Sequence, residues 1–312
     1  WETREAMVLF GRRGTIDGAR LFVAGRGFVA PGGGPTVAPL QHVPHEVDRP
    51  ALARILVRDN AERRVDMIKV WVDDRLPTVP KLAPDVYRAI IDEAHKQGLR
   101  VMAHVFYLDD AKDLLRAGVG GFAHLVRDQA VDDEFVSMVK ARNVFICTAI
   151  SPHSSPTGQW IDDPALSETV SESVRAKYRP AAAAPDGPMS PGTLLPRMHE
   201  SIRKLNAAGV RFAFGTDTVL PGRFYGFNEH LELEGMVGSG LSPLQVLTIA
   251  TGDSAAILGL KDAGTIAAGK RADFMVLDAN PLDSIRNTRR IAHVYRGGLA
   301  IDRAAMRKAM VR

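Results

Sequence analysis

The sequence comprises 312 residues, of which 46% are hydrophobic and 24% are charged, values that are ordinary for a globular protein. This length accommodates one large barrel domain or two domains of average size. No apolar run approaches the length of a membrane span, so we expect no membrane insertion. The single cysteine, Cys147, excludes an internal disulfide framework and a cysteine-rich zinc site.

The net charge of +4 comes largely from arginine and lysine residues close to the C-terminus. Tyr295 is the one aromatic residue among them, so the sequence does not indicate a platform on which nucleic-acid bases could stack. We therefore interpret this excess as a solvated basic surface, and we expect no nucleic-acid partner.

Predicted helices and strands alternate along the first part of the chain. The predicted helices cover residues 2–13, 50–64, 84–98, 109–118 (with Asp109 as its cap) and 132–142, and the predicted strands cover residues 20–25, 65–72, 99–104 and 120–125. The helix over 84–98 is the clearest, because Pro84 lies in its first turn, Gly98 ends it, and Val86, Ile90 and Ala94 form one apolar stripe. Strands alternating with helices are typical of a parallel sheet covered by helices.

Two further strands, over residues 144–150 and 210–214, flank a long polar segment and a helix over 193–208. The polar segment, residues 151–192, is too long for a plain connector and is a candidate lid. An open doubly wound sheet would need no more strands than these. A (β/α)8 TIM barrel needs eight, so this α/β reading expects strands 3–8 to be present and strands 1–2 to be missing at the N-terminal side. We therefore expect the chain to be part of a longer protein.

The pattern changes after residue 217. Helices are predicted over 229–238, 242–251 and 253–258, and short strands over 264–266, 272–277 and 291–298. These strands are too few to bury a core alone and are expected to form part of a small β-sandwich. The predicted organisation is a partial barrel over residues 1–262 and the C-terminal strands of a small β-sandwich domain over residues 263–312.

Four polar residues lie at or near the ends of different predicted strands: Lys69, His104, His124 and Asp217. A barrel gathers such residues at one mouth. Two imidazoles and a carboxylate suit a divalent ion, zinc first. A bound metal would lower the pKa of water to roughly 7 and supply hydroxide, and Asp217 would act as the general acid/base.

Each of these residues has another interpretation. A single histidine at a strand end is often structural, and Asp217 alone is compatible with a turn or a helix cap. Lys69, flanked by apolar residues, is compatible with a Schiff-base lyase or aldolase. A truncated, non-catalytic barrel kept for binding or assembly is a third hypothesis.

The chain resembles the metal-dependent amidohydrolase superfamily, in particular its imidazolonepropionase-like and prolidase-like branch. The resemblance rests on Met67–Val70, Val101–His104, Gly121–His124, Phe214–Asp217 and, most specifically, the tail Gly264–Leu277. It implies that Lys69 is N-carboxylated and bridges two divalent metals, that His104 and His124 bind one of them, and that Asp217 binds the other and moves the proton. Zn²⁺ is the expected metal, with Mn²⁺ and Co²⁺ as alternatives.

The chain departs from this family pattern because it contains no His-x-His pair. His42 and His45 lie in a proline-rich loop and are not expected to substitute for it. The missing pair agrees with the two missing strands, so we expect the chain alone to be inactive and poorly soluble.

The predicted substrate contacts are Phe106, Tyr107, Arg127, His153 and His230. Strand alternation would place Phe106 on the same side as His104, as an apolar pocket floor. Tyr107 would contact a substrate carbonyl, Arg127 would receive a substrate carboxylate, and both histidines would face the same mouth.

The expected function is hydrolysis of a C–N bond in a small-molecule substrate: a non-peptide amide, a cyclic amide or a dipeptide-like compound. Assembly as a homo-oligomer is left open. A cytoplasmic location is favoured, and export remains an alternative because the chain does not begin with methionine.

Overall fold

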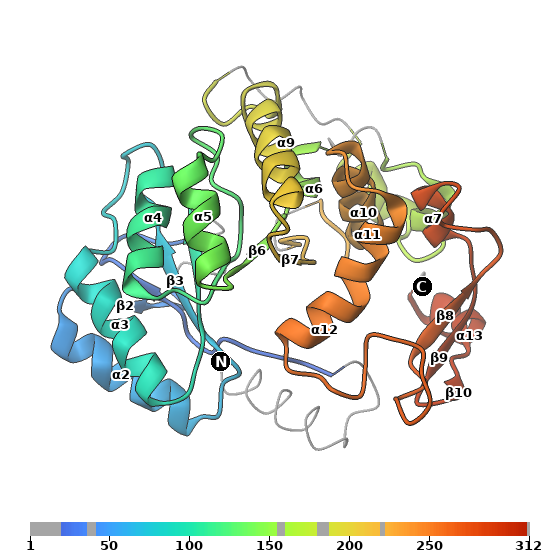
Figure 1. The fold of residues 1–312 in the computed structure, drawn as a ribbon. Coiled ribbons are helices and arrows are strands. Elements are labelled where there is room, and N and C mark those ends of the chain that lie inside the picture. The colour runs from blue at the N-terminus through green and yellow to red at the C-terminus, as the bar shows by residue number, and fades with distance from the viewer. Residues whose placement is uncertain (1–19, 36–41, 155–159, 180–186, 219–221, 311–312) are drawn as a thin grey trace. The chain divides into compact units, whose positions relative to one another are not determined.

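The computed structural model of the chain describes residues 20–35, 42–154, 160–179, 187–218 and 222–310. The chain forms two compact units, which are drawn in Figure 1. The first unit comprises residues 1–126 and 133–144, and the second comprises residues 127–132 and 145–312. The helix predicted over residues 2–13 lies outside the described residues.

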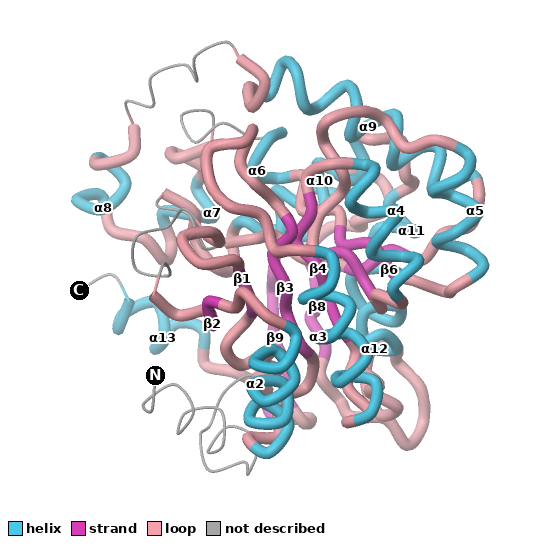
Figure 2. The backbone as a smooth tube through the Cα atoms, turned by 90° about the vertical axis from the view of Figure 1, so that its left-hand side faces the viewer, coloured by secondary structure: helices cyan, strands magenta, loops and turns pink. Residues whose placement is uncertain are grey.

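The first unit is built on a parallel sheet. Its strands are β1 (Phe28–Val29), β2 (His45–Glu46), β3 (Ile68–Val72), β4 (Val101–Val105) and β5 (Gly121–Phe122). They lie in the order β2-β1-β3-β4-β5, and each neighbouring pair is parallel. Figure 2 labels β1, β2, β3 and β4 of this sheet among the magenta strands. Parallel strands joined by helices form an α/β architecture, as the alternation of elements predicts.

The two longest strands, β3 and β4, alternate between a buried and a half-buried face. Ile68, Val70 and Val72 are buried in β3, whereas Lys69 and Trp71 between them are half-buried. In β4 the same alternation leaves Met102 and His104 half-buried. The register pairs Lys69 with Met102 and Trp71 with His104. One face of this sheet therefore belongs to the core, and the other carries the polar residues that the sequence singles out.

Four described helices complete the first unit. They are α2 (Pro50–Glu62), α3 (Pro84–Lys96), α4 (Leu108–Ala117) and α5 (Asp133–Ala141). Helix α2 packs against α3, α3 contacts α4, and α4 contacts α5. As predicted, α3 has a proline in its first turn and buries Val86, Ile90 and Ala94 completely. Helix α4 ends at Gly118, whose φ of 95° is accessible to glycine without strain.

The second unit contains one parallel pair of strands and one antiparallel sheet. The parallel pair is β6 (Phe145–Cys147) with β7 (Phe212–Ala213), and the antiparallel sheet consists of β8 (Phe274–Leu277), β9 (Ile291–Arg296) and β10 (Leu299–Ala300) in the order β10-β9-β8. Phe274 stacks on Tyr295 across β8 and β9, with ring centroids 4.6 Å apart. Met275 and Leu299 in this small sheet are exposed.

The described helices of the second unit are mostly short. They are α6 (Ser151–Ser154), α7 (Pro164–Ser167), α8 (Glu172–Ala176), α9 (Pro191–Ala207), α10 (Asn228–Gly238), α11 (Pro243–Thr248), α12 (Ser254–Ile257) and α13 (Arg303–Met310), with a π-helical turn over Ile249–Asp253 and a 3₁₀ turn over Ile285–Arg289. Ser242 and Gln245 form a capping box at the start of α11.

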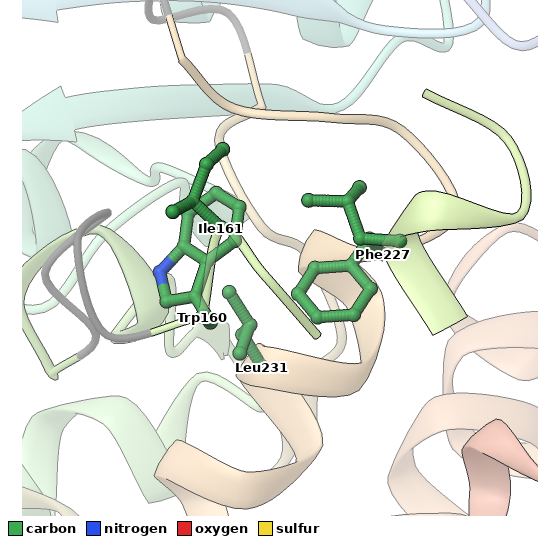
Figure 3. Packing of buried hydrophobic residues seen from close by; sticks show 5 residues of the cluster. Trp160, Ile161, Phe227 and Leu231 are labelled. Carbon is green, nitrogen blue, oxygen red and sulfur yellow. The ribbon is translucent and has the colours of Figure 1, made fainter. Parts of the chain in front are cut away.

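The long segment predicted over 151–192 contributes to a hydrophobic cluster. Trp160, Ile161 and Leu166 from this segment pack with Phe227 and Leu231 from the region of α10 (Figure 3). The Trp160 and Phe227 ring centroids lie 5.4 Å apart. The described part of the segment is therefore anchored by buried aromatic and aliphatic side chains, and its role as a lid stays a prediction.

Three local predictions are wrong. Residues 20–25 do not form a strand: Leu21 is 42% exposed, and the backbone of Val23 is held by Asp66 instead. The neighbouring strand is β1, where Phe28 is fully buried, because burial rather than an apolar run selects the strand. Residues 264–266 also lack a strand, and α4 begins after Tyr107 rather than at Asp109.

Candidate active site

Lys69 lies in the middle of β3 on the half-buried face. Its ammonium nitrogen is 5.1 Å from the centre of the Trp71 ring, which follows it on the same face of the strand. Trp71 pairs in register with His104 of the neighbouring strand β4, and Lys69 lies two residues before Trp71 in β3. The structure thus places Lys69 and His104 on one face of the β3–β4 ladder.

His104 and His124 come together at the carboxyl ends of neighbouring strands. His104 is the next-to-last residue of β4, and His124 follows β5 closely. Ala123 donates its backbone N–H to Ala103 at 2.8 Å, which continues the ladder up to the two histidines. Their ring centroids are 4.6 Å apart with the planes at 76°, an edge-to-face arrangement. Two imidazoles this close can present nitrogen donors to a common ligand.

Two consecutive acids directly after β3 complete this edge of the sheet. Asp73 Oδ2 is 3.0 Å from His104 Nε2. Asp74 Oδ1 accepts a hydrogen bond of 2.8 Å from the Tyr107 hydroxyl. Sequence reasoning missed both, although a pair of acids at the end of a predicted strand was a signal available in the sequence.

Tyr107 is held on two sides. Besides the Asp74 contact, the Lys81 ammonium lies 4.4 Å from the centre of its ring and forms an ion pair of 2.7 Å with Asp110. Burial, together with the adjacent Asp74 carboxylate, raises the pKa of Tyr107 to about 12. The phenol therefore keeps its proton at neutral pH and donates a hydrogen bond to Asp74. Phe106 next to it is buried and lies just outside β4.

Asp217 follows β7 in the second unit at a strained position. Its φ is 51°, in the left-handed region that a non-glycine residue adopts at a cost, and its side chain is exposed. The flanking threonines Thr216 and Thr218 are buried and hydrogen-bond to each other at 2.5 Å. Phe214 donates its backbone N–H to Ser254 at 2.9 Å. The turn that presents Asp217 is thus fixed on both sides.

The positive charges of Arg127 and of Arg223, a residue that sequence reasoning missed, act on His153 in the second unit. Burial, together with the positive charges of Arg127 and Arg223, lowers the pKa of His153 to about 4. Arg223 donates to the Pro152 carbonyl at 2.9 Å, and its guanidinium lies 5.6 Å from the Trp160 ring centre. His153 is therefore a neutral imidazole beside two guanidinium groups at neutral pH.

His230 is engaged by the C-terminal part of the chain. Its Nδ1 is 2.9 Å from the Thr288 hydroxyl. Burial lowers the pKa of His230 to about 4, with the Arg289 charge acting in the same direction. The predicted site residues are divided between the two units. The first unit contains Lys69, His104, Phe106, Tyr107 and His124, and the second contains Arg127, His153, Asp217 and His230.

The donor set of the first unit fits a divalent metal ion. Within the described ranges, no group of three or more His, Cys, Asp or Glu side chains that could hold a metal ion is found. The His104–His124 pair nevertheless offers two imidazoles, and His104 has a carboxylate on its Nε2. An imidazole bonded to a carboxylate through its other ring nitrogen is the common form of a histidine ligand.

In the described part of the chain, no helix is long and apolar enough to cross a membrane.

Comparison with known proteins agrees with this reading. The family model described as "Amidohydrolase family" matches residues 4–301. The ochratoxinase of Aspergillus niger is 24% identical over 260 residues, which cover 78% of this chain and 48% of that enzyme. The imidazolonepropionase of Deinococcus deserti is 40% identical over 79 residues, 25% of this chain and 20% of that protein.

A crystal structure of a Xaa-Pro dipeptidase with methionine bound in its active site is similar in fold. It superposes with a TM-score of 0.70 at 23% identity and covers 95% of this chain and 71% of that one. Together with the parallel sheet and its helices, this likeness fits a fold of the TIM-barrel type. The chain belongs to the amidohydrolase family. It spans about half the length of the ochratoxinase that it matches.

Proposed function

We propose that this chain is part of a metal-dependent hydrolase of C–N bonds in non-peptide amides, cyclic amides or dipeptide-like compounds. The pairing of His104 with His124 at neighbouring strand ends, in a chain of the amidohydrolase family, is the observation that carries the proposal. The relatives named as ochratoxinase, imidazolonepropionase and dipeptidase favour a small-molecule substrate.

His104 and His124 would hold one divalent ion, Zn²⁺ first, with Mn²⁺ and Co²⁺ as alternatives. Lys69, on the same face as His104, would join them as an N-carboxylated lysine, and Asp217 would bind a second ion. Carboxylation would turn a half-buried cation into a carboxylate, which removes the cost of burying its charge. When bound, the metal supplies Lewis acidity and activates water.

Asp217 would act as the general acid/base. Its side chain is exposed on a turn fixed by Thr216, Thr218 and Ser254, so the carboxylate is held without being sequestered. It would accept a proton from the attacking water and pass it to the leaving nitrogen. A strained backbone at such a residue is typical of functional sites.

Substrate recognition would involve Phe106, Tyr107, Arg127, His153 and His230. The Tyr107 hydroxyl already donates its hydrogen bond to Asp74. Its oxygen is therefore better suited to accept a hydrogen bond from a substrate N–H than to donate one to a carbonyl. Arg127, with Arg223 near the same histidine, would receive a substrate carboxylate.

The same proposal covers the organisation of the chain. Residues 1–262 would form strands 3–8 of a (β/α)8 barrel, and residues 263–312 would form the last strands of a small β-sandwich. The exposed Met275 and Leu299 in the β8–β10 sheet support the second part, because a sandwich would cover such side chains.

The test is metal analysis and a substrate screen on the full-length protein. It would be loaded separately with zinc, manganese and cobalt, and offered N-acyl amino acids, dipeptides and cyclic amides. We expect about two metal ions per chain and hydrolysis within this panel. Absence of both bound metal and hydrolysis would overturn the proposal. Covalent trapping of a carbonyl substrate on Lys69 by borohydride would instead support the Schiff-base alternative.

A further inference from the structure

The contact between Asp73 and His104 links the end of β3 to the end of β4. Asp73 Oδ2 lies 3.0 Å from His104 Nε2, and the two side chains are only 15% and 19% exposed. A hydrogen bond at this distance and burial is shielded from competing water. It engages one particular ring nitrogen of His104, whereas the His124 ring approaches from the neighbouring strand.

A strained turn places the two acids that follow β3. Arg75 and Leu76 have φ values of 53° and 60°, two consecutive non-glycine residues in the left-handed region. Such residues cost of order 1 kcal/mol or more each and persist only where the surroundings hold them. Asp73 Oδ1 accepts the Arg75 backbone N–H at 2.9 Å, and the Asp74 carbonyl accepts the Thr78 N–H at 2.7 Å.

The turn sends the two neighbouring carboxylates to different partners. Asp73 reaches His104, whereas Asp74 reaches the hydroxyl of Tyr107. Each partner is on the segment that ends β4 and leads into α4. The chain therefore offers, side by side, one acid that contacts a candidate metal ligand and one that contacts a candidate substrate residue.

The contact between Asp73 and His104 determines which ring nitrogen of the neutral imidazole carries the proton. An ionised carboxylate only accepts hydrogen bonds, so a neutral His104 bonded to Asp73 must carry its proton on Nε2. The lone pair of the ring is then on Nδ1, which becomes the nitrogen that can bind a metal. A carboxylate on the other ring nitrogen also raises the basicity of a histidine ligand.

We propose that Asp73 is a positioning residue that sets His104 in the Nε2–H form and presents Nδ1 to a divalent metal. This inference rests on the proposed metal-dependent function for its consequence, but the tautomer itself is a property of the metal-free chain. Asp73 acts through His104 and does not itself bind the metal. Asp74 serves a different residue in the same turn and provides a matched control.

The first experiment measures the ring nitrogens of His104 in the full-length protein from which metal has been removed. Two-dimensional ¹⁵N correlation spectra of histidine-labelled protein would be recorded at about pH 8.5, above the ordinary imidazole pKa of about 6.5. His104→Gln identifies its signals. We expect a protonated Nε2 and an unprotonated Nδ1, and a mixture of tautomers in Asp73→Ala. A protonated Nδ1 in the wild-type chain would overturn the proposal.

The second experiment measures metal affinity by competition between the chain and a chromophoric chelator, with Zn²⁺ and Co²⁺ as the probes. Asp73→Ala should weaken binding by roughly 10- to 100-fold, the usual cost of losing such a partner. Asp74→Asn should leave both the affinity and the His104 signals unchanged. Equal affinity in wild type and Asp73→Ala would overturn the positioning role, even if the variant is less stable.

The two failures are distinguishable. If the wild-type full-length protein binds neither ion, the proposed metal-dependent function fails, and the spectra still decide whether Asp73 sets the tautomer. If the wild-type chain binds metal and the variants do not differ, only the role of Asp73 fails. A purely structural role would lower the melting temperature of Asp73→Ala without changing the His104 spectrum.

Discussion

Two polar regions of this chain differ in the charge of the side chains that act on their histidines. In the first unit, the ends of β3, β4 and β5 combine imidazoles with carboxylates, and His104 has Asp73 on its ring. In the second unit, burial and the positive charges of Arg127 and Arg223 lower the pKa of His153 to about 4. The first arrangement is suited to a metal cation, and the second to an anionic group of a substrate.

This contrast shows that the protonation state and the chemical role of a histidine depend on the charged groups near it rather than on its position relative to a strand. His104 is the next-to-last residue of β4, whereas His153 lies in the short helix α6 after β6. His104 receives a carboxylate that favours a metal-binding form, whereas burial and two guanidinium charges keep His153 uncharged. The following changes should separate these two roles.

The largest effect is expected at the imidazole pair. Replacing His124 with Ala removes a proposed ligand, so zinc affinity should fall by more than the roughly 100-fold that loss of an outer partner costs. Competition with a chelator and metal analysis after dialysis would measure this. His95→Ala, at an exposed position of α3, is the control and should bind like the wild type. If the His124 variant bound zinc as tightly as the wild type, the first region would not be the metal-binding region.

The second region depends on a buried acid that fixes the loop after β6. Glu232 is fully buried and accepts hydrogen bonds from the Thr148 hydroxyl at 2.5 Å and from the N–H groups of Ile150 and Ser151 at 3.0 and 2.8 Å. Glu232→Ala leaves these donors buried and unsatisfied, so the free energy of unfolding should fall by about 3 kcal/mol. Urea denaturation measures the loss.

Glu229→Gln, on the same helix, is the matched control for this loop. Glu229 accepts the Gly226 N–H at 2.7 Å, and glutamine retains an acceptor there, so the change should stay below about 1 kcal/mol. If both variants were equally stable, Glu232 would not be the anchor of the loop that carries His153.

The anionic preference of the second region can be tested on substrates. Arg223→Met should raise KM for a carboxylate-bearing substrate about 10- to 100-fold, since a charge-assisted hydrogen bond contributes about 1.5–3 kcal/mol. The corresponding carboxamide substrate should be affected much less. Arg203→Met, at an exposed position of α9, is the control. A parallel loss on both substrates would indicate that Arg223 supports the loop through Pro152 only.

Much of the fold was predictable because its signals are local. The prolines that begin α2 and α3, and the apolar stripe of α3, lie within one element. The strand over residues 20–25 failed because strand formation there depends on distant partners: Asp66 holds Val23, and Phe28 takes the buried position. Local hydrophobicity does not report which of two neighbouring runs will be covered.

The candidate site shows the same division. His104 and His124 were identified from their places at strand ends, and the structure brings them together. Asp73 and Arg223 were missed because their partners are remote in sequence: Asp73 meets His104 across two strands, and Arg223 meets Pro152 across a long segment. A single sequence contains no signal for which remote side chains a turn will face.

The smallest predicted effect concerns the pH dependence of stability at His153. Its pKa is about 4 in the folded chain and about 6.5 when unfolded, so between these values the unfolded state binds more protons. Stability from this group is therefore complete above pH 6.5 and falls as the pH drops toward 4, by at most about 1.4 kcal/mol per pH unit. His153→Gln should flatten the dependence by that amount in urea denaturation between pH 7 and 5, whereas His95→Gln should not. An unchanged slope would mean that His153 gains a proton without penalty, and then the second region would not be the cationic counterpart of the first.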